Sequence, residues 1–214
     1  MRNRHLLTAL GALLLAASCA AQPAPGAGVR RSGDAIVFEG RIDFASAARF
    51  LRLLDEPGLT RLVIDSPGGL VAPALDMAQA VHARGLAVEV PDTCLSSCAN
   101  YVFPAGSRKL LGRPDAVAWH GNMAHVLWLQ ASGQATWSDA EMQQAHALAR
   151  REEAFYRSIG VDGNVAWFGK IPPYSVDEFY YLSPAGMARF GIRDVTVRAG
   201  TAPSDPSRRL LTPD

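Results

Sequence analysis

The chain has 214 residues, of which 49% are hydrophobic and only 19% are charged. This length and composition fit one folded domain with a proper core and exclude a disordered chain. With 21 Lys and Arg against 20 Asp and Glu, the formal net charge is +1. That balance argues against a nucleic-acid binder that works through a basic face. Three cysteines are too few for a small disulfide scaffold.

Residues 1–21 have the pattern of an export signal. Two arginines are followed by an apolar run of about a dozen residues, which is too short to cross a bilayer and fits a signal-peptide core. The small residues before Cys19 resemble the bacterial lipobox, in which the cysteine is lipidated, although Ala16 stands where leucine is usual. Ordinary cleavage one or two residues beyond Cys19 is the alternative. Both predict export, to the periplasm or as an outer-membrane lipoprotein that faces it.

The rest of the chain divides into a body and two flanks. Residues 22–33 are rich in Pro, Gly and Ala and predict a linker, and the Pro-rich residues 200–214 predict a disordered tail. The remaining residues, 34–199, are expected to form one domain.

Apolar runs of strand and helical spacing alternate along this body. Asp43 is expected to cap the first helix, and Ser138 with Glu141 forms a capping box before the longest one. Strands are expected at 35–38, 62–64, 86–90, 109–111, 116–119 and 194–197, and helices at 44–54, 70–83, 99–105, 138–158 and 183–190. This alternation predicts an α/β fold with a largely parallel sheet, in which sites form at the carboxyl ends of strands.

Three segments at such strand ends could carry chemistry. Gly68-Gly69 follows a strand and precedes a helix, where exposed N–H groups can bind an anion. Residues 93–99 (TCLSSCA) put serines at the mouth of a helix, where a nucleophile is well placed. His120 ends an apolar strand and could act as a general base. Each alone also fits an ordinary role, as a glycine turn, a helix cap or a structural histidine.

The order of these segments resembles the Clp protease proteolytic subunit and its relatives in the crotonase-like superfamily. The motifs are residues 64–69 (IDSPGG), 97–106 (SCANYVFPAG) and 117–120 (VAWH), with a weaker match at 181–194 (YLSPAGMARFGIRD). The likeness covers about residues 60–195 and looks closer still to exported Clp-protease-like proteins with a Cys-x-x-x-Cys around the serine. It implies a repeated ββα spiral with a mostly parallel sheet.

The resemblance also implies a set of site residues. Counted back from residues 105–106, the family's nucleophile falls on Ser97, and its general base falls on His120. The oxyanion donors fall on backbone N–H groups, those of Gly68 or Gly69 and of Cys98.

The residue that orients the histidine is where this chain departs from the family. Ser175 stands where the family has an acid, so we expect Asp177 to serve, or else Asp162, with a plain Ser–His dyad as the third option. Related signal-peptide peptidases use a Ser–Lys dyad. Neither lysine of this chain, Lys109 or Lys170, lies in a recognised motif, and we therefore favour Ser–His.

Cys94 and Cys98 flank this serine turn at a spacing of four. In an oxidising compartment they are expected to form a disulfide that stiffens the turn. A zinc pair is the alternative, although no second pair of ligands is nearby in the sequence.

Taken together, the sequence predicts an exported serine hydrolase of the peptidase class that needs no cofactor and no metal. Its expected partners are a peptide or protein substrate and further copies of itself, with no nucleic acid, and a membrane only through a lipidated Cys19. Residues 122–137 are expected to contact peptide or a neighbouring subunit. The alternatives are an inactive binding or scaffold module in the cell envelope and, less favoured, a crotonase-like enzyme acting on a thioester.

Overall fold

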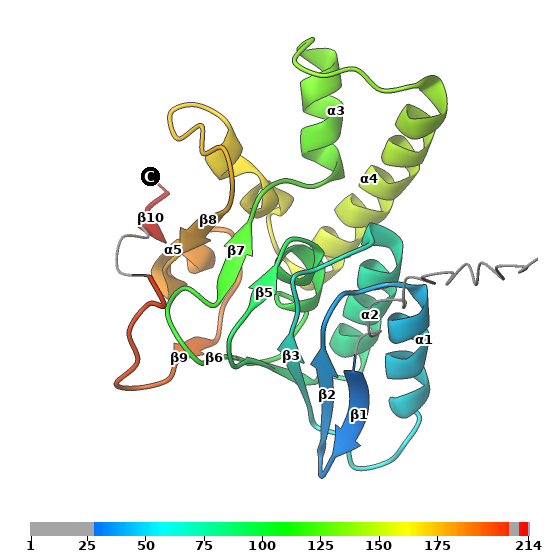
Figure 1. The fold of residues 1–214 in the computed structure, drawn as a ribbon, viewed down its shortest axis with the longest axis vertical. Helices are drawn as coiled ribbons and strands as arrows, with labels where there is room; N and C mark the ends of the chain where they lie inside the picture. Colours follow the sequence, from blue (N-terminus) through cyan, green and yellow to red (C-terminus); the bar gives the residue numbers. More distant parts are fainter. Residues whose placement is uncertain (1–27, 206–209, 214) are drawn as a thin grey trace, which may run out of the picture.

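The computed structural model describes residues 28–205 and 210–213, and these residues build two sheets with helices packed around them (Figure 1). The larger sheet has six strands in the order β1-β2-β3-β4-β6-β9. Its strands are β1 (Gly28–Ser32), β2 (Ala35–Glu39), β3 (Arg61–Asp65), β4 (Ala87–Val90), β6 (Lys109–Leu111) and β9 (Val195–Val197). All neighbouring pairs are parallel except β1 with β2. The α/β class with a mostly parallel sheet is therefore confirmed.

The smaller sheet has four strands in the order β10-β8-β7-β5. They are β10 (Leu210–Leu211), β8 (Tyr180–Leu182), β7 (Val117–Trp119) and β5 (Cys94–Leu95). Single parallel bridges join Ser66 to Cys94 and Ile42 to Gly69. The chain thus passes from the carboxyl ends of the larger sheet into the smaller one, which brings the segments after β3, β5 and β7 together.

The helices follow the expected caps. Asp43 accepts a hydrogen bond from the backbone of Ser46 at the start of α1 (Phe44–Leu53), and Ser138 forms a capping box with Glu141 at the start of α4 (Asp139–Ile159). Figure 1 shows α3 and α4 projecting together beyond the sheets, while α1 and α2 pack beside the larger one. The other helices are α2 (Val71–Ala83), α3 (Met123–Ala131), α5 (Pro184–Arg189), the π-helix η1 (Cys98–Val102) and the 3₁₀ turns η2 (Gly163–Ala166) and η3 (Phe168–Lys170).

The predicted flanks are more ordered than expected. Residues 28–32 were predicted to belong to the linker but form β1, because each pairs with a residue of β2. The predicted disordered tail also contributes structure: residues 210–211 pair with β8, and Ser204 bonds to the buried carboxylate of Asp115. The predicted signal peptide and Cys19 lie outside the described residues. No helix in the described ranges is long and apolar enough to cross a membrane.

Candidate active site

Ser96 and His120 form a hydrogen-bonded pair at the ends of two neighbouring strands. Ser96 directly follows β5 and His120 directly follows β7, and these strands pair in parallel. The Ser96 Oγ and the His120 Nε2 are 2.7 Å apart. When the imidazole carries its proton on Nδ1, Nε2 can accept the serine proton, which is the geometry of a nucleophile beside its base.

The backbone of Ser96 has the shape of an exposed turn. Its φ is +55°, a left-handed conformation that residues other than glycine rarely adopt. The turn is held on both sides: the Ser96 N–H donates to the carbonyl of Ala118, and the Ser96 carbonyl accepts from the N–H of Asn100. Such strain, over-determined by its surroundings, is typical of functional sites.

The structure does not form the expected pair of Ser97 with His120. The Ser97 side chain is only 3% exposed, and its hydroxyl donates to the carbonyl of Gly69 at 2.7 Å. The geometry therefore favours Ser96 over Ser97 as the candidate nucleophile.

The serine turn leads into a π-helix, η1. The N–H of Phe103 donates to the carbonyl of Cys98, five residues back, whereas an α-helix closes its bonds over four residues. Counting back from residues 105–106 placed the nucleophile on Ser97, whereas the serine that faces His120 is Ser96.

Gly68 passes so close to the serine turn, and Gly69 so close to Ile42, that neither could carry a side chain. A Cβ on Gly68, whose φ is +87°, would lie 2.5 Å from the carbonyl oxygen of Leu95 and 2.9 Å from the nitrogen of Ser97. A Cβ on Gly69 would lie 1.9 Å from the carbonyl oxygen of Ile42. The glycine pair thus lines the turn with bare backbone.

This backbone offers two free donors. The Gly68 N–H is occupied by the hydroxyl of Ser66 at 3.1 Å. Within the described residues, the N–H groups of Gly69 and Ser97 donate no hydrogen bond. Since an oxyanion hole uses the N–H of the residue after the nucleophile, the expected donor Cys98 gives way to Ser97 once Ser96 takes the central place.

The expected disulfide between Cys94 and Cys98 is present and brackets Ser96. It joins the first residue of β5 to the first residue of η1, with a Cα–Cα distance of 5.3 Å, and both cysteines are buried. The disulfide closes the loop between Cys94 and Cys98 that contains Ser96. Because both thiols are consumed, they cannot form the zinc pair considered as the alternative.

His120 lies at the surface, with its ring 4.6 Å from the ring of Phe179. Partial burial of the imidazole lowers its pKa, and the positive charge of Lys170 lowers it further. The Lys170 ammonium donates to the backbone carbonyls of Asp177 and Glu178, so it also anchors the segment that carries Phe179. Both effects favour the neutral imidazole that a general base requires.

Neither expected acid contacts His120. Asp177 is exposed and takes part only through its backbone carbonyl, while the carboxylate of Asp162 accepts from the N–H of Asn164 and caps η2. In the part of the chain that the structure describes, the one hydrogen bond of His120 is the one to Ser96. The geometry is that of a dyad, the third option of the sequence analysis.

Asn100 is a residue of this site that the sequence analysis missed. It is 3% exposed, and its amide Nδ2 donates to the carbonyl of Gly121 at 2.8 Å while its N–H holds Ser96. It therefore ties the serine turn to the residue after His120. The one signal in the sequence was a single amide in an otherwise apolar run.

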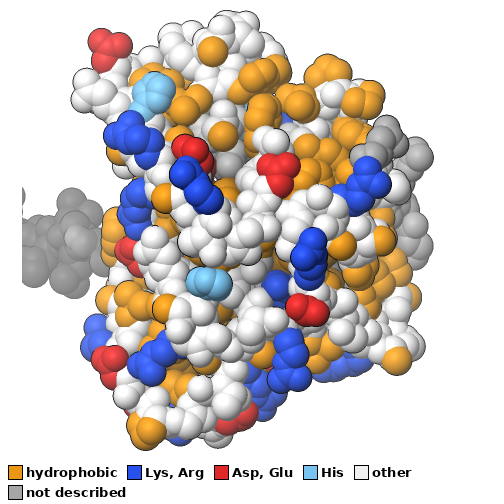
Figure 2. Space-filling model, turned by 180° about the vertical axis from the view of Figure 1, so that it is seen from behind, with side chains coloured by type: hydrophobic (Ala, Val, Ile, Leu, Met, Phe, Trp, Pro, Cys, Tyr) orange, Lys and Arg blue, Asp and Glu red, His pale blue; other side chains and the backbone are white. Residues whose placement is uncertain are grey.

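An apolar groove opens beside Gly69. Its volume is about 370 Å³, and it runs between the starts of α1 and α2 and the pair α3–α4. Phe44 and Leu70, two large apolar residues at this groove, are 64% and 43% exposed. Figure 2 shows apolar side chains at the top of the molecule, the end that α3 forms in Figure 1.

Comparison with models of known protein families gives no match, and comparison with curated proteins gives none either. The family resemblance thus rests on the sequence motifs alone. Among the described residues, no group of three or more His, Cys, Asp or Glu side chains is arranged to hold a metal ion.

Proposed function

We propose that this protein is a serine hydrolase of the peptidase class, with Ser96 as nucleophile and His120 as general base. The observation that carries the proposal is the 2.7 Å contact between the Ser96 Oγ and the His120 Nε2, formed at a strained turn beside two free backbone N–H groups. The free donors are those of Gly69 and Ser97.

The proposed reaction has two halves. The Ser96 Oγ attacks the carbonyl carbon of an amide, its proton passes to the Nε2 of His120, and the carbonyl oxygen becomes an oxyanion near the N–H groups of Gly69 and Ser97. The imidazolium then protonates the leaving amine, and an acyl ester remains on Ser96. Water, deprotonated by His120, hydrolyses this ester and restores the serine.

The Ser97 hydroxyl has a supporting part in this scheme. By donating to the carbonyl of Gly69, it fixes the glycine strand relative to the serine turn. The two proposed oxyanion donors therefore keep their spacing before substrate arrives, and a preorganised pair stabilises the developing charge most.

The apolar groove beside Gly69 supports a polypeptide substrate. It begins at a residue of the proposed oxyanion hole and has a volume within the range of about 300–1,000 Å³ that is usual for ligand sites. An acyl group bound to Ser96 would lie next to apolar walls, which favour an aliphatic or aromatic side chain of the substrate.

Family, assembly and location complete the proposal. The bridges between the two sheets are compatible with the ββα spiral of the Clp-protease-like resemblance, and relatives of that kind assemble as homo-oligomers. The disulfide is compatible with an oxidising compartment and supports export.

The proposal is tested with a fluorophosphonate probe on the purified protein. We expect the wild type to be labelled and Ser96→Ala to be unlabelled. Ser97→Ala is the matched control: it keeps Ser96 and His120 and should still be labelled, more slowly because Gly69 loses its partner. Labelling that survives in Ser96→Ala and disappears in Ser97→Ala would assign the nucleophile to Ser97 instead.

An inactive scaffold is the second candidate, and the dyad geometry favours it to some degree. Without a carboxylate at His120, the imidazolium formed in the reaction has no counter-charge. A folded wild type that neither reacts with the probe nor cleaves any peptide would support the scaffold and overturn the hydrolase.

A further inference from the structure

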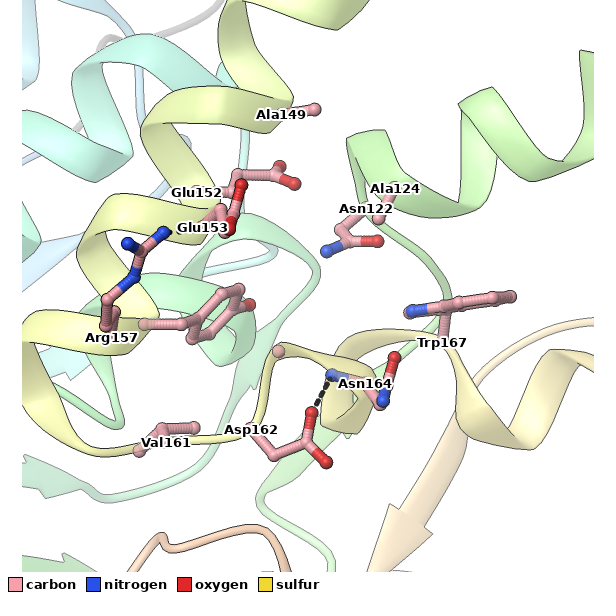
Figure 3. Close-up of a pocket in the computed structure, with 12 residues that line it drawn as sticks. Asn122, Ala124, Ala149, Glu152, Glu153, Arg157, Val161, Asp162, Asn164 and Trp167 are labelled. Carbon is pink, nitrogen blue, oxygen red and sulfur yellow. Dashed lines mark hydrogen bonds and ion pairs between the residues drawn. The ribbon is translucent and has the colours of Figure 1, made fainter.

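A second cavity is lined by Asn122, which is close to His120 in the chain, and by residues of α4. It has a volume of about 390 Å³ and is bounded by α4, the start of α3 and the segment around η2 (Figure 3). Its lining includes Asn122, Trp167 and the charged residues Glu152, Glu153, Arg157 and Asp162.

The cavity is joined to the dyad through the backbone. Asn122, at its rim, is two residues beyond His120. The N–H of Gly121 donates to the carbonyl of Ala166 at 2.8 Å, and the next residue, Trp167, lines the cavity. The backbone that follows His120 is therefore continuous with one wall of this cavity.

Glu152 is the unusual residue of the cavity. It is only 2% exposed, and its Oε1 accepts from the hydroxyl of Tyr101 and from the N–H of Met123. Its Oε2 has no hydrogen-bond partner, and neither has the hydroxyl of Tyr156, which is also buried and also lines the cavity. Unpartnered buried polar atoms are costly, and they call for a partner that the chain itself does not supply.

The charges around the cavity favour a cation as that partner. Three carboxylates line it, those of Glu152, Glu153 and Asp162, against one guanidinium, that of Arg157, which pairs with Glu153 at 2.8 Å. Burial raises the pKa of Glu152, although its contacts with the hydroxyl of Tyr101 and the backbone N–H groups of Met123 and Ala124 act in the opposite direction. A bound cation would remove that penalty.

The walls also suit an organic cation. The aromatic side chains of Tyr156 and Trp167 line the cavity together with the carboxylates. Aromatic faces attract guanidinium and ammonium groups, and a carboxylate can take a guanidinium through paired hydrogen bonds. The volume lies within the range usual for ligand sites, about 300–1,000 Å³.

We propose that this cavity binds the guanidinium or ammonium group of a basic side chain of the polypeptide substrate, with Glu152 and Asp162 as its anionic partners. The substrate part of this inference rests on the proposed hydrolase function. The cation-binding part does not, because it follows from the unpartnered carboxylate oxygen and the lining charges alone.

The binding part is tested by calorimetry with agmatine, which carries both a guanidinium and an ammonium, and with the neutral N-butylurea. We expect agmatine to bind and N-butylurea not to bind. Glu152→Gln, which keeps an oxygen for Tyr101 and Met123, and Asp162→Asn should each weaken agmatine binding about tenfold or more. Asp55→Asn is the matched control, because it loses the same charge at an exposed residue that does not line the cavity.

No agmatine binding, or equal binding by the wild type and a folded Glu152→Gln protein, would overturn the cation site. Thermal unfolding of each variant shows whether it is folded.

The substrate part is tested with matched fluorogenic peptides that carry either arginine or the isosteric, neutral citrulline at successive positions. At one position we expect the arginine peptide to be cleaved with a kcat/KM about tenfold higher, and Glu152→Gln to abolish that preference. Cleavage without any preference, with agmatine still bound, would assign the site to a free amine and overturn the substrate part. Agmatine binding without cleavage of any peptide would instead count against the hydrolase and leave the cation site standing.

Discussion

Gly68 offers a sharp test of how tightly the glycine strand packs against the serine turn. Replacing it by alanine places a Cβ 2.5 Å from the carbonyl oxygen of Leu95 and 2.8 Å from the Cβ of Ser96. Non-bonded Cβ contacts this short are not tolerated, so the turn must move. The φ of +87° adds left-handed strain.

The expected cost has two parts. Left-handed strain for alanine amounts to about 1–2 kcal/mol, and forcing an extra carbon into a packed site costs about 1–3 kcal/mol. Gly85→Ala is the matched control, because its φ is +63° and a Cβ there would meet no atom within 4 Å. Gly85→Ala should therefore lose only the first part, and Gly68→Ala should lose roughly 2–5 kcal/mol in total.

Urea denaturation measures the free energy of unfolding of both variants, and the rate of fluorophosphonate labelling measures the site. Because the overlap pushes on Ser96 itself, we expect labelling of Gly68→Ala to slow by about a hundredfold, as a displacement of about 1 Å does. Gly85→Ala should label like the wild type. Equal stability and equal labelling of the two variants would refute the packing argument.

Three further predictions concern the groups that hold Ser96 and His120. Asn100→Ala leaves the half-buried carbonyl of Gly121 without its side-chain donor, so the free energy of unfolding should fall by about 1–3 kcal/mol and labelling should slow; unchanged labelling would remove Asn100 from the site. Since burial and Lys170 lower the pKa of His120, labelling should persist as the pH falls below 6.5, and Lys170→Met should move its decline to higher pH; a pH profile that does not move would contradict this. Replacing both cysteines of the Cys94–Cys98 bridge by alanine should lower the free energy of unfolding by about 2 kcal/mol, because the closed loop is short. Labelling should slow even under conditions where the variant remains folded, and labelling at the wild-type rate would contradict a role of the bridge in holding Ser96.

Features of the fold that depend on residues close together in the chain were predicted correctly from the sequence. Asp43 and the pair Ser138–Glu141 cap their helices as expected, because a cap depends only on residues three positions apart. Apolar runs such as residues 62–64 became strands for the same local reason. The α/β class followed from this alternation alone.

Long-range pairing was less predictable. Residues 28–32 are polar and rich in arginine, and only their pairing with β2 makes them a strand. Residues 210–211 likewise become a strand only against β8. A linker and a tail were reasonable expectations because neither segment has an apolar period of its own.

In the candidate site, too, the positions of the segments were predictable from the sequence, but the contacts between individual side chains were not. Gly68-Gly69, the serine turn and His120 were all found from their places after strands, because the carboxyl ends of strands meet. The sequence placed the nucleophile on Ser97, whereas the serine hydrogen-bonded to His120 is Ser96, and nothing in the sequence distinguishes these neighbouring serines. Asp177 was not brought to His120, because Lys170 binds its backbone and its carboxylate faces solvent.

Under the proposed function, the surroundings of His120 determine how fast the site can work. In a triad, a carboxylate holds the imidazole in one tautomer and stabilises the imidazolium. Here the ring packs against Phe179, which fixes its position, but the nearest charge that acts on it is the ammonium of Lys170, which disfavours the imidazolium. The missing carboxylate and the nearby ammonium both disfavour the imidazolium of His120. That positive charge exists only after the proton of Ser96 has been transferred. They should therefore lower kcat and leave KM unchanged, so that a folded enzyme reacts with the probe yet turns over peptides slowly.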